Sequence, residues 1–81
     1  MHEMSIATAI LEQAREQWQQ RPESRLTKIG LRLGEYAGVD ISSLTFCYEV
    51  LVKDTDFEPV TLEIEHADRD ELQMTFLEFD E

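Results

Sequence analysis

The sequence predicts an α+β domain with two layers, in which two helices pack on one face of a three-stranded sheet. Two stretches place apolar residues at the spacing of an amphipathic helix, and three others alternate apolar and polar residues as half-buried strands do. The order along the chain is helix, strand, helix, strand, strand. Two layers would bury all five apolar stripes. With 81 residues, we expect residues 1–81 to form a single domain with one shared core.

The first helix is expected from Ser5 to about Arg21. Ser5 is a suitable N-cap, and Pro22 disfavours helical geometry at the residue before it. The opposite side of the helix carries charged and amide side chains, so this is an amphipathic helix. Its apolar face consists of Ile6, Ala7, Ile10, Leu11, Ala14 and Trp18.

The first strand is expected over residues 27–33, where Thr27, Ile29, Leu31 and Leu33 alternate with Lys28, Gly30 and Arg32. Leu26, at its start, does not fit this alternation. Gly34 and Gly38 bracket a short loop, and their backbone freedom allows the loop to fold tightly.

Asp40 is expected to cap the second helix, which ends near Asp54. Val39 and Leu44 stand at the two positions of a hydrophobic staple around this cap. Capping alone accounts for Asp40, and a role in metal binding would require its second carboxylate oxygen to face the N-terminus. Cys47 falls on the apolar stripe and is interpreted as a core residue. The stripe consists of Leu44, Cys47, Tyr48 and Leu51.

The last two strands are expected over residues 60–65 and from Leu72 onward, joined as a hairpin through the turn-like residues 66–70. The alternation of the final strand fails at Phe76 and Leu77. Either a β-bulge reverses the facing there, or both sides are covered so that Leu77 and Phe79 also pack.

Composition excludes several classes of function. A formal net charge of −11 disfavours binding to nucleic acid or to an anionic membrane surface. No stretch approaches the roughly 20 apolar residues of a membrane span, and the N-terminus lacks a secretion signal, so a cytoplasmic protein is expected. A single cysteine permits neither an internal disulfide nor a four-cysteine zinc cluster. Neither a nucleophile elbow nor a phosphate loop is present, so we do not expect an enzyme.

The strongest candidate for a functional site is the opening Met1-His2-Glu3-Met4. The α-amine of Met1, the deprotonated backbone amide of His2 and its imidazole could hold a metal in a flat chelate, with Glu3 supplying an oxygen. Such ligation suits Ni(II) or Cu(II) better than zinc. The alternative from these four residues alone is an exposed histidine at a frayed terminus.

Three segments together resemble the HypA/HybF family of nickel metallochaperones in hydrogenase maturation. They are residues 1–7 (MHEMSIA), residues 32–35 (RLGE), and Gly38-Val39-Asp40 running into residues 43–46 (SLTF). The resemblance implies a Ni(II) site at Met1 and His2, with Glu3 and Asp40 as auxiliary ligands. It also implies delivery of nickel to two partners, a nickel GTPase and the hydrogenase large subunit.

The chain departs from the family pattern between its last two strands. Family members ordinarily carry a zinc domain there, with two Cys-x-x-Cys pairs, whereas the interval from Glu65 to Leu72 contains no cysteine. The chain thus resembles the nickel-binding domain without the zinc domain, and we expect no bound zinc. His66, in this interval, is either a ligand left from a second site or an exposed turn histidine. The alternative function is a metal-independent interaction or regulatory module that keeps the family's docking surface.

Overall fold

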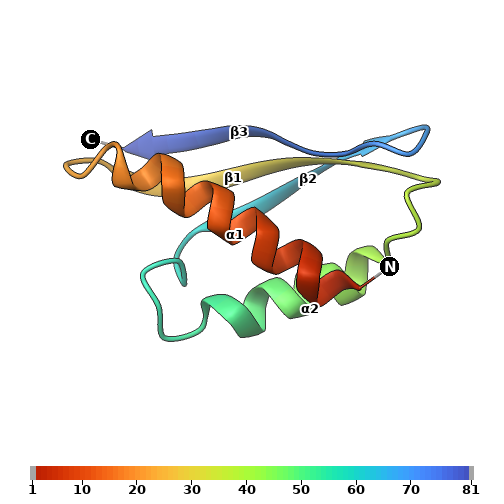
Figure 1. Ribbon diagram of the computed structural model, residues 1–81, viewed down its shortest axis with the longest axis horizontal. Helices are drawn as coiled ribbons and strands as arrows, with labels where there is room; N and C mark the ends of the chain where they lie inside the picture. The colour runs from red at the N-terminus through yellow and green to blue at the C-terminus, as the bar shows by residue number, and fades with distance from the viewer. Residues whose placement is uncertain (1, 81) are drawn as a thin grey trace.

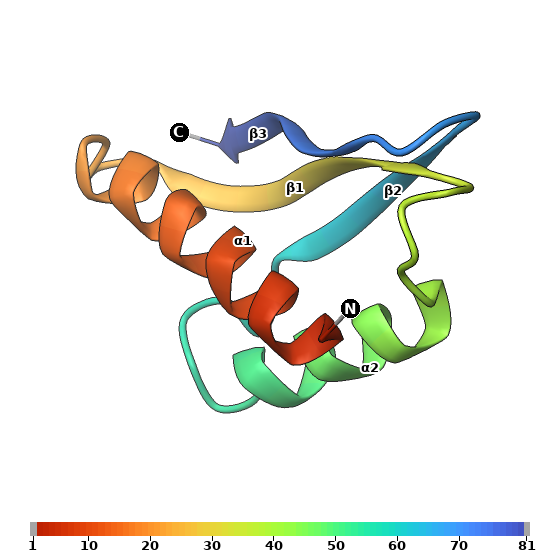
Figure 2. The same cartoon turned by 45° about the vertical axis from the view of Figure 1, so that its right-hand side comes forward.

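The computed structural model describes residues 2–80 and has two helices on one side of a sheet (Figure 1, Figure 2). Its elements are α1 (Glu3–Gln19), β1 (Arg25–Gly34), α2 (Ile41–Val52), β2 (Thr61–Ala67) and β3 (Leu72–Asp80). Both helices lie on the same side of the sheet in the two ribbon views. The predicted α+β class and element order are confirmed. Within residues 2–80, no helix combines the length and apolar character needed to cross a membrane.

The predicted hairpin between the last two strands is wrong, because β1 lies between them. The strand order is β2-β1-β3, with β1 parallel to β2 and antiparallel to β3. Helix α2 provides the long crossover that a parallel pair requires. The four inward residues of β1 are almost fully buried, at 0 to 2% exposure, while those of β2 and β3 are only half-buried. The strand with the most deeply buried side chains therefore lies at the centre of the sheet.

The segment that joins β2 to β3, residues 68–71, crosses over the end of β1. Backbone amides of Gly34, Glu35 and Tyr36 donate to the carbonyl oxygens of Glu71 (2.7 Å), Ala67 (3.0 Å) and Arg69 (2.7 Å), respectively. A Cβ on Gly34 would lie 2.6 Å from the carbonyl carbon of Arg69. Glycine at this position is therefore required by close backbone approach.

Two β-bulges explain why the strand patterns were irregular. The register between β1 and β3 shifts between Leu26 and Lys28, so Thr27 is the extra residue and Leu26 is buried at 1% exposure. The structure corrects the expected alternation here, since Leu26 rather than Thr27 joins the core.

The second bulge lies in β3. Gly30 pairs with Phe76 and Leu31 pairs with Met74, so Thr75 is the extra residue. The bulge reverses the facing of β3, which places Phe76 on the open face of the sheet and Leu77 toward the helices. Of the two alternatives for this strand, the bulge is confirmed. Phe76 covers Gly30, because a Cβ on Gly30 would meet the Phe76 ring.

The core lies between the helices and β1 and includes the loop after α2. Tyr48 donates a hydrogen bond of 2.8 Å to the carbonyl oxygen of Val60, and burial raises the pKa of its phenol to about 12. Cys47 is half-buried and packs against the edge of the core. The buried residues are Ala7, Ile10, Ala14, Leu26, Ile29, Leu31, Leu33, Leu44, Tyr48, Val52, Phe57 and Val60.

Helix α1 begins before the predicted N-cap at Ser5. His2 is the N-cap through its backbone, and its carbonyl oxygen accepts from the amide of Ile6 at 3.2 Å. The earlier start accompanies a contact between segments 37 residues apart, in which the Glu3 carboxylate meets the amide of Asp40. Serine is a good cap locally, but this long-range contact stabilises a start at Glu3.

Candidate metal centre

The N-terminal ends of α1 and α2 lie close together, since the Glu3 carboxylate accepts a hydrogen bond from the Asp40 amide. His2 and Glu3 from the first helix face Ser42 and Ser43 from the second across a hollow of about 520 Å³. The hollow also has Met4 and Cys47 in its wall. The fold therefore brings the start of the chain beside the cap of α2.

Glu3 links the two helix ends. Its Oε2 accepts a hydrogen bond of 3.0 Å from the backbone amide of Asp40. This bond is the first cause of a lowered pKa for the Glu3 carboxyl, and the amide of Glu3 itself adds to the effect. Glu3 is thus ionised at neutral pH and has one oxygen committed to the fold.

Asp40 caps α2, as the sequence predicted. Its Oδ1 accepts hydrogen bonds from the amides of Ser42 (2.9 Å) and Ser43 (3.3 Å). Among residues 2–80, no hydrogen bond to its Oδ2 is found. Leu44 is fully buried and Val39 packs against the core, which fits the expected staple. The carboxylate therefore has one oxygen used in capping and a second that the cap does not use.

His2 is exposed, and its imidazole makes no capping hydrogen bond. The fold uses only its backbone, so the ring is available for other chemistry. Met1, whose amine belongs to the expected chelate, lies outside the described residues.

The described side chains do not form a complete metal site. In the part of the chain from His2 to Asp80, no group of three or more His, Cys, Asp or Glu side chains is arranged to hold a metal ion. The structure brings the Glu3 carboxylate into contact with the Asp40 amide, and His2 lines the same hollow as Glu3. Any tight chelate here would therefore have to draw on backbone nitrogens as well as side chains.

Two electrostatic effects oppose each other at this end of the molecule. The N-termini of both helices carry partial positive charge, which disfavours a cation nearby. The carboxylates of Glu3 and Asp40 lie at those same ends and offset that charge. The two effects therefore act in opposite directions on a cation at this end of the molecule.

His66 is exposed but does not lie in a turn. It belongs to β2 and pairs with Leu33 of β1. It lines a second hollow of about 450 Å³ together with Asp40 and Asp68. The sequence pattern missed this placement, because β2 extends two residues beyond the expected strand end at Glu65.

Over residues 1–71 the chain matches the family described as "Hydrogenase/urease nickel incorporation, metallochaperone, hypA". It is 38% identical over 66 residues to the hydrogenase maturation factor HypA of Aeromonas hydrophila, covering 82% of this chain and 58% of that protein. It is 37% identical over 68 residues to HypA of Chlorobaculum parvum, covering 84% and 60%. The hydrogenase maturation factor HybF of Klebsiella pneumoniae is 35% identical over 65 residues, covering 80% and 58%. The chain thus spans less than two thirds of the length of these relatives.

Proposed function

The chain belongs to the HypA family of metallochaperones for nickel incorporation, and we propose that it binds Ni(II) at its N-terminus and delivers it during maturation of [NiFe]-hydrogenase. The observation that supports this proposal is the meeting of the two helix ends, where the Glu3 carboxylate accepts from the backbone amide of Asp40 and His2 lines the same hollow as Glu3. Nickel is the cargo of such a protein, and no bond of a substrate is made or broken.

The proposed ligands are the amine of Met1, the backbone amide and imidazole of His2, and oxygens from Glu3 and Asp40. In support, the His2 ring has no capping bond and the cap leaves Oδ2 of Asp40 unused. Glu3 keeps its Oε1 for this purpose, since Oε2 holds the Asp40 amide. Nitrogen and oxygen donors of this kind suit Ni(II) in tetragonal geometry.

Delivery requires that the metal be reachable by its acceptor. His2 is exposed at the molecular surface. An acceptor protein could therefore replace the ligands of the nickel ion one at a time without unfolding the domain. The proposed acceptors are a nickel GTPase and the hydrogenase large subunit. Residues of both helices share one close-packed core behind His2 and Glu3, which limits the movement of the two helix ends relative to each other.

A nickel titration followed by visible absorption tests the site. His2→Ala removes the imidazole, and a Gly-Ser extension before Met1 displaces the amine while leaving every side chain in place. Both should weaken nickel binding severely, with circular dichroism unchanged. His66→Ala is the matched control and should bind nickel as the parent does. Binding should also weaken as the pH falls, because protons compete for the nitrogen ligands.

Normal binding by the extended protein, combined with loss in His2→Ala, would leave His2 as a side-chain ligand and eliminate the amine and amide chelate. Loss of nickel binding in His66→Ala instead would indicate that nickel binds in the second hollow, which His66 lines. A chain that binds its partners but no nickel would support the alternative, a metal-independent interaction module.

A further inference from the structure

Strand β2 lies at one edge of the sheet and pairs only with β1 within residues 2–80. A contact at the end of β2 shows where its backbone groups point. The amide of Glu35, which follows β1 directly, donates to the carbonyl oxygen of Ala67 at 3.0 Å, so the backbone groups of Ala67 point toward β1. Backbone groups alternate in direction along a strand. Those of Leu62, Ile64 and His66 therefore point away from β1, along the free edge.

The free edge of β2 is regular. In the described part of the chain, the backbone groups of Leu62, Ile64 and His66 take part in none of the hydrogen bonds made by turns and loops. They present three N–H and three C=O groups over about 13 Å, at about 3.3 Å for each residue step. The opposite edge of the sheet, formed by β3, is interrupted by the bulge at Thr75. Strand β2 is therefore the better template for an added strand.

The side chains beside this edge on the open face of the sheet are acidic. Glu63 pairs with Lys28 at 3.4 Å and Glu65 pairs with Arg32 at 3.3 Å, yet the two glutamate side chains remain 57% and 60% exposed. Strand β2 has no Lys or Pro, the residues that often protect an edge strand from pairing. The edge repels a second copy of this chain, whose formal charge is −11, and attracts a basic segment.

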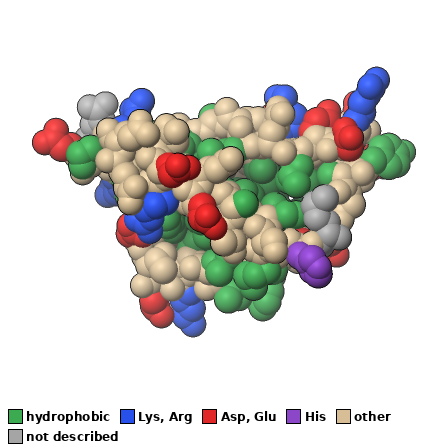
Figure 3. Space-filling model, in the orientation of Figure 1, with side chains coloured by type: hydrophobic (Ala, Val, Ile, Leu, Met, Phe, Trp, Pro, Cys, Tyr) green, Lys and Arg blue, Asp and Glu red, His purple; other side chains and the backbone are tan. Residues whose placement is uncertain are grey.

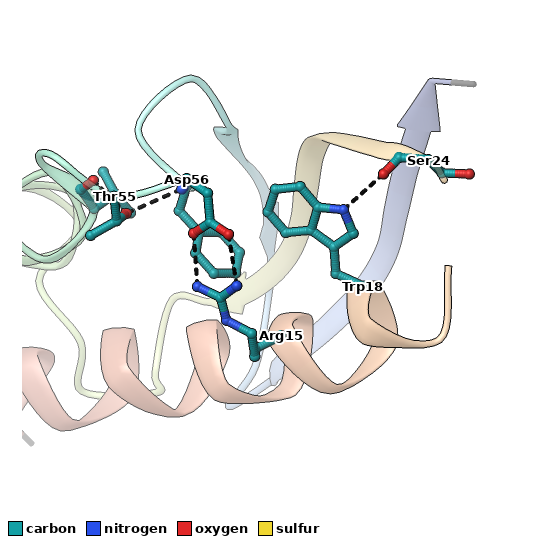
Figure 4. A network of polar contacts seen from close by, with 7 residues as sticks. Arg15, Trp18, Ser24, Thr55 and Asp56 are labelled. Carbon is teal, nitrogen blue, oxygen red and sulfur yellow. Dashed lines mark hydrogen bonds and ion pairs between the residues drawn. The ribbon is translucent and has the colours of Figure 1, made fainter. Parts of the chain in front are cut away.

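The start of β2 is fixed by contacts of the loop that precedes it. Arg15 of α1 donates to both carboxylate oxygens of Asp56 at 2.7 and 2.8 Å (Figure 4). Tyr48 of α2 donates to the carbonyl oxygen of Val60, the residue before β2, at 2.8 Å. The edge is thus held in place before a partner arrives, which reduces the entropy lost on binding.

We propose that the free edge of β2 binds an extended segment of a partner protein as an added antiparallel strand, in which Lys or Arg alternates with apolar residues. Backbone hydrogen bonds to Leu62, Ile64 and His66 would supply affinity, as in other cases of strand addition. The residues opposite Glu63 and Glu65 would then form non-hydrogen-bonded pairs, in which side chains approach most closely. Basic residues there would face the two glutamates. This edge requires no nickel and is independent of the proposed metal site.

Three short fluorescent peptides test the proposal. The parent peptide alternates Lys and Val, the second carries N-methyl groups on its valines, and the third carries them on its lysines. Methylated valines lack the N–H groups that face the edge of β2, whereas methylated lysines lack those that face water. In fluorescence anisotropy with the metal-free protein, the parent and the third peptide should bind, and the second should bind about tenfold more weakly or worse. Equal binding of the two methylated peptides, or no binding of the parent, would overturn the proposal.

Paired substitutions separate this edge from general attraction to an acidic protein. Figure 3 shows red acidic side chains over α1 as well, so a basic peptide has other places to gather. Glu63→Gln combined with Glu65→Gln should weaken binding of the parent peptide about fivefold, the value of two exposed ion pairs. The matched control, Glu12→Gln combined with Glu16→Gln, removes the same charge from α1 and should change binding by less than about twofold. Equal weakening by both double variants would overturn the proposal.

Amide resonances in NMR spectra locate the peptide. The N–H groups of Leu62, Ile64 and His66 gain partners, so their resonances should move more than those of Glu63 and Glu65, whose N–H groups already face β1. Shifts confined to α1 or β3 would refute the edge of β2 as the site. His66→Pro removes one outward N–H without breaking a bond to β1, and should weaken binding while circular dichroism stays unchanged. Dimers in sedimentation that the parent peptide dissociates would identify a second copy as the occupant and would also overturn the proposal.

Discussion

Replacement of Gly34 by alanine tests how the domain closes over the end of β1. The added Cβ would lie 2.5 Å from Oε1 of Glu71 and 2.6 Å from the carbonyl carbon of Arg69. Ordinary contacts between carbon atoms are about 3.5 to 4.0 Å long. The segment of residues 68–71 would therefore have to move by about 1 Å. Two short backbone hydrogen bonds, both 2.7 Å, hold it in place and would be stretched by that movement.

The expected loss of stability is about 2 kcal/mol. Forcing atoms into a packed site costs about 1 to 3 kcal/mol, and a weakened hydrogen bond adds up to about 1 kcal/mol. Alanine also restricts the unfolded chain, which returns about 0.4 to 1 kcal/mol. For a domain of 81 residues, the net effect corresponds to a fall of about 10 °C in the unfolding midpoint.

Urea unfolding followed by circular dichroism measures this change, and Gly30→Ala is the matched comparison. At Gly30 the three atoms nearest to the new Cβ all belong to the ring of Phe76, a side chain that is 38% exposed and can therefore shift more easily than backbone. Gly30→Ala should therefore cost clearly less than Gly34→Ala. If Gly34→Ala is as stable as the parent, or if both variants lose equally, the close crossing over β1 is wrong.

Three further predictions concern the N-terminal end and its metals. Asp40→Ala should lower the free energy of unfolding by about 1 kcal/mol and Asp40→Asn should leave it nearly unchanged, since Asn caps equally well; equal urea midpoints for the two variants would contradict this. The hydrogen bond from the Asp40 amide lowers the pKa of the Glu3 carboxyl in the folded state below its ordinary value of 4.5. The ionised Glu3 therefore stabilises the fold fully above pH 4.5, and this stabilisation is lost as the pH falls through the pKa of Glu3 in the folded state. In Glu3→Gln the free energy of unfolding should consequently fall less steeply as the pH drops below 4.5. An unchanged dependence on pH would refute this role of Glu3. Elemental analysis of protein purified without added metal should find zinc far below stoichiometry; near-stoichiometric zinc would reveal a site that needs no thiolate cluster.

The sequence by itself determined the elements and the cap of α2. Helical spacing and strand alternation record which side of each element is buried, and that information is local to 10 or so residues. The cap at Asp40 was predictable for the same reason, because its carboxylate bonds the amides two and three residues ahead. The two apolar residues that do not alternate in β3 indicated a bulge as one of two explanations.

Only the tertiary structure decided the strand order, the bulge at Thr27 and the first residue of α1. Alternation states that a strand has a buried side but does not state which strand it pairs with, so neighbours in sequence suggested a hairpin. In the structure β1 lies in the centre instead, and its inward side chains are almost fully buried there. The bond from the Asp40 amide to Glu3 spans 37 residues, and no local pattern encodes a contact of that range. Because that bond brings the two helix ends together, the geometry of the candidate metal site is a property of the fold, while the identities of its ligands are a property of the sequence.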